Sequence, residues 1–171
     1  GLGFLTASSW KDLPKAMNAV VAGKFSIESR TLLSAIGQSC LDKFKLKAMN
    51  DFVISRGSIP RMIRLEVKVD GEVLTTYRCD GLVVSTSTGS TAYSLAAGGA
   101  IIAPEAKVIS ITPICPHTLS NRAVIINQQS TIEVRMLDTK REANLSADGW
   151  DCLELETKTP VIIRRNPQSV K

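Results

Sequence analysis

Histidine, paired cysteines and aromatic residues are scarce in this 171-residue sequence, and their scarcity limits the sites that it can hold. There is one histidine, His117, and no two cysteines have C-x-x-C spacing. This pattern argues against a zinc site and predicts isolated, mostly buried thiols in a reducing compartment. The cysteines are Cys40, Cys79, Cys115 and Cys152.

Long apolar runs are lacking as well. No run approaches the ~18 residues of a membrane-spanning helix, so we expect no membrane partner. The first residues, "GLGFLTASSWK", lack the basic and apolar regions of a secretory signal peptide, and we expect cytoplasmic localisation. Because the sequence starts without Met inside an apolar, Gly-rich stretch, we also expect it to be the downstream part of a longer protein.

Positive charge exceeds negative charge, since 21 Lys and Arg stand against 16 Asp and Glu and give a formal net charge of +5. This excess favours an anionic partner. The basic residues are scattered, however, and aromatic residues make up only 5% of the chain. Nucleic-acid binding normally combines basic grooves with stacking rings, so a basic nucleic-acid-binding domain is the least favoured function.

A helix is predicted near residues 12–22, where Asp12 suits the cap, Pro14 the first turn and Gly23 the stop. After Gly23 the apolar residues alternate with a period of two, which is typical of strands. The apolar stripe of the helix consists of Trp10, Leu13, Met17, Val20 and Val21.

Two Asp-Gly dipeptides, Asp70-Gly71 and Asp148-Gly149, lie between alternating runs and predict tight hairpins. Many short strands with regular turns are typical of an antiparallel sandwich. We therefore predict a mainly β fold, a single antiparallel β-sandwich-like domain with two short helices. Beside the first hairpin, strands are expected at 81–86, 107–113, 122–127, 131–137, 143–147 and 151–156.

The stretch "STSTGSTAYSLAAGG", residues 85–99, has no charged side chain and is dense in hydroxyls and small residues. It predicts a polar loop that leads from a strand into a short helix near 89–97, which Gly98-Gly99 ends. Backbone N–H groups at such a helix start, with the ring of Tyr93 and an acceptor at Asp80, suit a nucleotide. A capped helix without a ligand fits the residues equally well.

The longer stretch "DGLVVSTSTGSTAYSLAAGG" resembles the signature of NAD kinases, the ATP-dependent enzymes that phosphorylate NAD to NADP. The resemblance continues in "AMND" at 48–51, "TPICPHTLSNRAVII" at 112–126 and "LSADG" at 145–149, and "GLGFLT" at 1–6 is similar to a segment of the same family.

The resemblance implies that residues 1–171 are the C-terminal, NAD-binding domain of such an enzyme, with 1–23 as the connecting segment and first helix. It implies ATP as phosphoryl donor, a divalent metal such as Mg²⁺, NAD and NADP as ligands, and a homo-oligomer (dimer or tetramer) whose sites include a neighbouring subunit. The family's catalytic aspartate belongs to a Gly-Gly-Asp-Gly-Thr loop in an N-terminal α/β domain. That loop does not occur in this sequence, so no catalytic residue and no metal ligand is assigned here.

By position, the resemblance implies a set of NAD-binding residues. The Asn50-Asp51 pair would bind dinucleotide hydroxyls and base, Asp80 would lie near the nicotinamide end, and Asp148 near the reacting ribose. The full set is Asn50, Asp51, Arg61, Arg78, Asp80, Thr88, Thr91, Ala92, Tyr93, Ser94, Ala96 and Asp148.

The sequence departs from the family pattern at two positions, and several residues have alternative interpretations. Asp51 stands where many members have glutamate, and Ser87 replaces a common proline. The Asn50-Asp51 pair, Asp80-Gly81 and Asp148-Gly149 could be turns alone, and Tyr93 could be a core ring. A non-catalytic dinucleotide-binding or oligomerisation module is the alternative function.

Overall fold

The computed structural model describes residues 9–117, 122–138 and 142–170. In these residues a 3₁₀ turn at Trp10–Asp12 leads into one α-helix, α1 (Leu13–Val21), and twelve strands follow. Between β6 and β7 lies a helical segment made of a 3₁₀ turn, η2 (Thr88–Thr91), and a short helix, α2 (Tyr93–Ala96). The strands are β1 (Arg30–Gln38), β2 (Lys43–Ala48), β3 (Asp51–Arg56), β4 (Ile63–Val69), β5 (Glu72–Cys79), β6 (Gly81–Thr86), β7 (Val108–Ile114), β8 (Val124–Asn127), β9 (Ile132–Met136), β10 (Ala143–Ala147), β11 (Trp150–Glu154) and β12 (Val161–Val170).

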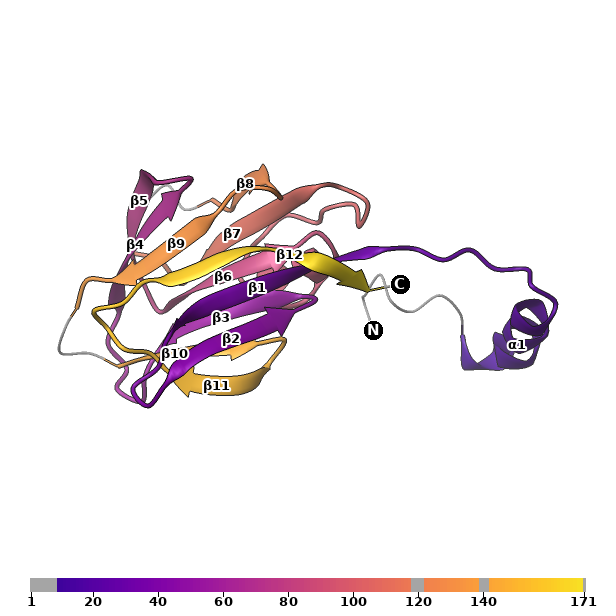
Figure 1. Cartoon of the computed structure of the whole chain (residues 1–171), viewed down its shortest axis with the longest axis horizontal. Coiled ribbons are helices and arrows are strands. Elements are labelled where there is room, and N and C mark those ends of the chain that lie inside the picture. Colours follow the sequence, from indigo (N-terminus) through magenta and orange to yellow (C-terminus); the bar gives the residue numbers. More distant parts are fainter. Residues whose placement is uncertain (1–8, 118–121, 139–141, 171) are drawn as a thin grey trace.

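The strands form two six-stranded sheets in which every described pair is antiparallel. One sheet has the order β2-β1-β12-β9-β4-β5, and the other has the order β11-β10-β3-β6-β7-β8. Figure 1 shows them stacked face to face. This arrangement confirms the predicted mainly β, antiparallel sandwich-like fold.

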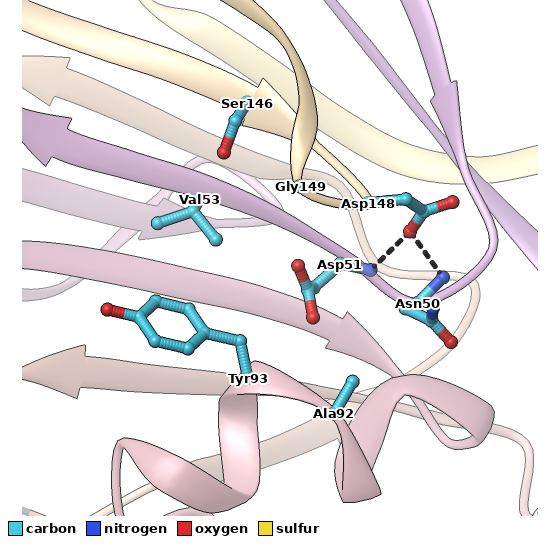
Figure 2. A pocket seen from close by; sticks show the side chains of 8 residues that line it. All are labelled: Asn50, Asp51, Val53, Ala92, Tyr93, Ser146, Asp148 and Gly149. Atoms are coloured by element: carbon cyan, nitrogen blue, oxygen red, sulfur yellow. Dashed lines mark hydrogen bonds between the residues drawn. The ribbon is translucent and has the colours of Figure 1, made fainter. Parts of the chain in front are cut away.

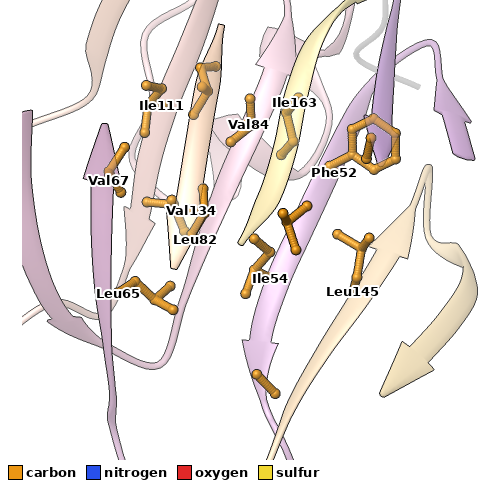
Figure 3. Close-up of a cluster of buried hydrophobic side chains, with 14 of the residues drawn as sticks. Phe52, Ile54, Leu65, Val67, Leu82, Val84, Ile111, Val134, Leu145 and Ile163 are labelled. Carbon is orange, nitrogen blue, oxygen red and sulfur yellow. The ribbon is translucent and has the colours of Figure 1, made fainter. Parts of the chain in front are cut away.

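The core lies between the two sheets and is built by strand alternation (Figure 3). Leu65 and Val67 of β4 point inward from the first sheet, and Phe52 and Ile54 of β3 point inward from the second. All four side chains are at most 1% exposed, and burying each one fully contributes about 1.5–3 kcal/mol. The residues between them in the sequence therefore lie on the outer faces, where sites can form.

The predicted helix is confirmed, but its apolar stripe is not covered by the described residues. Trp10, Leu13, Met17 and Val20 are 80%, 56%, 55% and 52% exposed. Figure 1 shows α1 away from the sheets, at the end of an extended segment. None of the described helices is both long enough and apolar enough to cross a membrane.

The prediction of mostly buried thiols is wrong for three of the four cysteines. Cys79 points inward from β5 and is buried, whereas Cys40, Cys115 and Cys152 are exposed. Cys40 lies in the turn after β1 and Cys115 just beyond β7, where no second layer covers them. All four are free thiols.

Candidate functional site

Three segments that are distant in the sequence meet at a pocket of about 360 Å³ on the outer face of the second sheet (Figure 2). They are the turn between β2 and β3, the start of α2, and the hairpin turn between β10 and β11. The pocket is lined by Asn50, Asp51, Val53, Ala92, Tyr93, Ser146, Asp148 and Gly149.

Asp148 connects two of these segments. Asp148 and Gly149 form the two-residue hairpin turn, with φ of 50° and 77°, the positive values that such turns require. The Asp148 carboxylate also accepts hydrogen bonds from the backbone N–H groups of Met49 (2.7 Å), Asn50 (2.7 Å) and Asp51 (3.0 Å). Asp148 therefore makes the predicted hairpin and in addition fixes the Asn50-Asp51 turn beside it.

The end of β6 holds the same turn from the other side. Thr86 donates its hydroxyl to the Met49 carbonyl oxygen (2.6 Å) and its backbone N–H to that of Asn50 (2.9 Å). Its Oγ1 accepts the backbone N–H of Gly89 (2.9 Å). A Cβ atom at Gly89 would lie 2.0 Å from the Asn50 carbonyl oxygen. The η2 turn can therefore pack against residues 49–51 only with glycine at this position.

The hydroxyls of the polar stretch are mostly used inside it. Ser87 Oγ donates to the Ala106 carbonyl oxygen (2.5 Å), and Ser90 Oγ donates to that of Ser87 (2.7 Å). Ser94 Oγ lies 3.1 Å from Thr112 Oγ1 and is buried. These bonds make the stretch a rigid loop rather than a flexible linker, and they hold α2 against β7.

Asp51 carries the main electrostatic feature of the pocket. Its side chain is 3% exposed and points from the start of β3 toward the α2 segment (Figure 2). Burial, and then the nearby charge of Asp148, raise the pKa of Asp51 from 3.8 to about 6, against a smaller opposing effect of the Tyr93 backbone N–H. A carboxyl group with this pKa can accept a hydrogen bond when ionised and donate one when protonated.

Tyr93 is not a core ring, because 47% of it is exposed. Figure 2 shows the ring across the pocket from Ser146 and Val53, with Asp51 near its base. Val53 and Ser146 are cross-strand partners between β3 and β10, so they form a small floor that faces the ring. A flat, half-exposed ring over such a floor can stack on a planar base.

Five residues of the predicted set line this pocket together, namely Asn50, Asp51, Ala92, Tyr93 and Asp148. Sequence reasoning missed Val53, Ser146 and Gly149. Strand alternation could have found Val53, because it lies two residues from Asp51 on the same face, and Ser146 is its cross-strand partner.

The other predicted residues do not line the pocket. Thr88, Thr91, Ser94 and Ala96 belong to the η2–α2 segment but lie beside or behind the lining residues. Arg78 and Asp80 precede β6, and Arg61 lies between β3 and β4, near the end of β6 that is opposite to the pocket. Asp51 pairs with Ser85, which lies about 16 Å along β6 from Asp80 by strand geometry. There Asp80 pairs with Arg56 at 3.1 Å. Ligand contacts of all twelve residues stay predictions.

The sequence and the structure were compared with known proteins. A family model, the ATP-NAD kinase C-terminal domain, matches residues 49–171. NAD kinase of Clostridium beijerinckii is 37% identical over 170 residues, which cover 99% of this chain and 60% of that protein. NAD kinase of Chlorobium phaeobacteroides is 41% identical over 169 residues, covering 99% and 59%.

Solved structures of NAD and NADH kinases also match this chain. The crystal structure of yeast NADH kinase complexed with NADH matches with a TM-score of 0.84 at 33% identity, over 97% of this chain and 49% of that one. The structure of an NAD kinase from Archaeoglobus fulgidus in complex with ATP has the same fold, with a TM-score of 0.83 at 24% identity over 99% of this chain and 63% of that one. The chain thus spans about 60% of the length of the curated relatives described above. It belongs to the ATP-NAD kinase C-terminal domain family.

Proposed function

We propose that this chain supplies the dinucleotide pocket of an NAD kinase, which transfers the γ-phosphoryl group of ATP to the 2′-hydroxyl of the adenosine ribose of NAD. The observation that carries the proposal is the meeting of the Asn50-Asp51 turn, Asp148 and Tyr93 at one pocket. These are residues that the family resemblance assigns to the dinucleotide.

The roles follow from the chemistry of each group. The Tyr93 ring stacks on a base, and base–aromatic stacking contributes about 1–3 kcal/mol per base. The Asp51 carboxyl and the Asn50 amide bind ribose hydroxyls, since together they offer donors and acceptors. Asp148 positions both residues through its three backbone hydrogen bonds and adds negative charge beside the ribose.

The family implies ATP and a divalent metal in addition, and the pocket was compared with that expectation. Among residues 9–117, 122–138 and 142–170, no group of three or more His, Cys, Asp and Glu side chains could hold a metal ion. The pocket offers two carboxylates, and Asp148 already accepts three N–H groups. The described residues therefore do not fit a complete metal site, and no step is assigned to a metal on this chain.

Two further features support proposals about assembly and location. Arg61, Arg78 and Asp80 lie away from the pocket of their own chain, so we infer that a second copy places them at a neighbour's dinucleotide in a homo-oligomer. Sedimentation tests this inference, and a strict monomer at tens of micromolar, a rough working range, would contradict it. Three exposed free cysteines suit a reducing compartment such as the cytoplasm.

Isothermal titration calorimetry with NAD tests the pocket. Tyr93→Ala is expected to weaken NAD binding by about 1–3 kcal/mol because the stacking ring is lost. Phe25→Ala is the matched control, since Phe25 is also an exposed ring (57%) but lies in the extended segment after α1. Equal affinity of the wild type and Tyr93→Ala would contradict the proposal.

A further inference from the structure

A second hollow, of about 560 Å³, lies on the first sheet, where β2, β1 and β12 are neighbours. We call it the basic hollow. Four of its lining residues are cationic, and none of the described residues that line it is acidic. Three of the four, Lys45, Lys47 and Arg164, point outward into it, whereas Arg165 pairs with the core residue Leu33 and points to the other face of β12. The lining consists of Ser34, Ile36, Lys45, Lys47, Arg164, Arg165, Asn166, Pro167 and Gln168.

Strand register brings these cations together. Lys47 of β2 and Arg164 of β12 both pair with Ser34 of the central strand β1. Side chains opposite one another on neighbouring strands share a face, so the ammonium and guanidinium groups flank the Ser34 hydroxyl. Lys45 lies two residues from Lys47 and points to the same face.

An irregularity in β12 forms the wall of the basic hollow. Leu33 pairs with Arg165, but the next pair is Thr31 with Ser169, so residues 166–168 stand opposite a single residue of β1. Asn166, only 4% exposed, fixes this bulge. Its Nδ2 donates to Ser34 Oγ (2.9 Å) and its Oδ1 accepts the Gln168 N–H (2.9 Å).

The bulge also holds one of the cations in place. Lys47 Nζ donates to Gln168 Oε1 at 2.6 Å, which uses one of the three ammonium donors and leaves two for a ligand. The Ser34 hydroxyl accepts from Asn166, so its own hydrogen can be donated to a further acceptor. In this wall Ser34 and Asn166 are buried and bonded to each other, and the exposed Lys47 and Gln168 are bonded to each other.

The three outward-facing cations, Lys45, Lys47 and Arg164, have no ion-pair partner among the described residues. The described residues form ion pairs at Arg30–Glu28, Arg56–Asp80 and Arg64–Asp138, and none of these involves the basic hollow. Like charges gathered on one face repel one another and destabilise the fold. An anion bound among them would remove that repulsion.

We propose that the basic hollow binds the phosphoryl groups of a small polyanion, either inorganic triphosphate or the triphosphate of a nucleotide. Arg164 offers a planar fork that matches phosphate oxygens in pairs. Lys45 and Lys47 add point charges, and Ser34 a neutral donor. The site lies on the sheet opposite the one that carries the Asp51–Tyr93 pocket, and it needs none of that pocket's residues.

Calorimetry on the 171-residue chain at low ionic strength tests this proposal, with inorganic triphosphate and ATP as separate ligands. Two variants, Arg164→Gln and Lys45→Gln/Lys47→Gln, should each weaken triphosphate binding at least about tenfold. The control Lys68→Gln/Arg135→Gln removes the same charge as the lysine pair, but from β4 and β9 of the same sheet. It should change triphosphate affinity less than about twofold. Amide NMR spectra confirm that each variant is folded.

The outcomes distinguish inorganic triphosphate from a nucleotide as the ligand, and the basic hollow from the Asp51–Tyr93 pocket. Equal effects of both variants on triphosphate and ATP indicate recognition of the phosphate chain alone, whereas a larger effect on ATP indicates a nucleotide. Unchanged NAD affinity in both variants keeps the basic hollow distinct from the dinucleotide pocket. The proposal is overturned if triphosphate does not bind, if the control weakens it equally, or if only a single-stranded oligonucleotide binds.

Discussion

At the scale of single residues, Asp148 does two things to its surroundings. Its carboxylate organises the 49–51 turn through three backbone N–H groups. The same charge is the second cause, after burial, of the raised pKa of Asp51. The turn that presents Asn50 and Asp51 to a ligand is thus stabilised by a group that also makes ionised Asp51 less favourable.

Because ionised Asp51 is unfavourable in the folded chain, the effect of Asp51→Asn on stability should depend on pH. The pKa of Asp51 is about 6 when folded against 3.8 for the free side chain. The folded state therefore binds the proton more tightly, and stability is lost as pH rises from about 4 through 6. At pH 7.5 the free energy of unfolding of the variant should be about 2–3 kcal/mol higher than that of the wild type. This difference should vanish near pH 4.

Urea unfolding at several pH values measures this effect. Asp42→Asn, an exposed turn residue, is the control and should show no comparable gain at pH 7.5. A stability gain of Asp51→Asn that is the same at pH 4 and pH 7.5 would show that ionisation of Asp51 is not its cause.

Gly89→Ala should damage the pocket although Gly89 does not line it. The added methyl would overlap the Asn50 backbone, so η2 and the turn must separate, at a loss of roughly 2–4 kcal/mol of stability. Gly23→Ala adds a methyl to open space at φ of 70° and should lose only about 1 kcal/mol. Thermal unfolding compares the two, and similar losses would contradict the steric argument.

The residues of the pocket were partly predictable from the sequence. Asn50, Asp51 and Tyr93 carry the family resemblance, and the Asp148-Gly149 hairpin follows from turn chemistry. The bonds between Asp148 and residues 49–51 could not be predicted, because they join segments about 100 positions apart, such as Asp148 and Asn50 with a separation of 98. The raised pKa of Asp51 depends on the same long-range contact.

At the scale of elements, α1 differs from every strand of the sandwich. Its apolar stripe is largely exposed, and isolated helices shorter than about 12–15 residues are marginal in water. The strands, by contrast, bury their inward side chains between two sheets. We therefore expect α1 to be far less stable than the sheets in the 171-residue chain.

Hydrogen exchange measures this difference. Amides of Leu13–Val21 should exchange at rates close to those of an unfolded peptide, whereas amides of β6 at the centre of its sheet should exchange only on global unfolding. Protection of α1 as strong as that of β6 would mean that the stripe packs against something in solution.

Prediction of the elements succeeded where local patterns are strong. The Asp70-Gly71 hairpin is confirmed by the β4–β5 register, and the predicted strands 81–86 and 143–147 match β6 and β10. The sequence reading gave no strand for β1, β2, β3 or β12. The β3 sequence has three consecutive apolar residues, Phe52, Val53 and Ile54, and β12 contains Pro167 in its bulge. Both patterns depart from simple alternation.

At the scale of the whole molecule, binding and chemistry are expected to separate. The proposed dinucleotide pocket lies within this chain, whereas no Gly-Gly-Asp-Gly-Thr loop occurs in the sequence. Phosphoryl transfer depends on positioning and charge neutralisation around the γ-phosphate. The described residues offer no acidic cluster that could hold a metal for that purpose.

The 171-residue chain should therefore bind NAD weakly and make no measurable NADP from NAD and ATP. A coupled NADP assay checks this, with a full-length NAD kinase as the positive control. Clear NADP production by the chain alone would contradict the separation of binding from chemistry.

An NMR titration of the 171-residue chain with NAD tests the central claim most directly, because it locates the ligand. The account predicts that the amide signals of Asp51, Tyr93 and Gly149 shift together and saturate with one binding constant, while those of β1, β2 and β12 stay in place. Saturable shifts that avoid the pocket, or no shifts at millimolar NAD (~1 mM, where even weak specific sites fill), would contradict it.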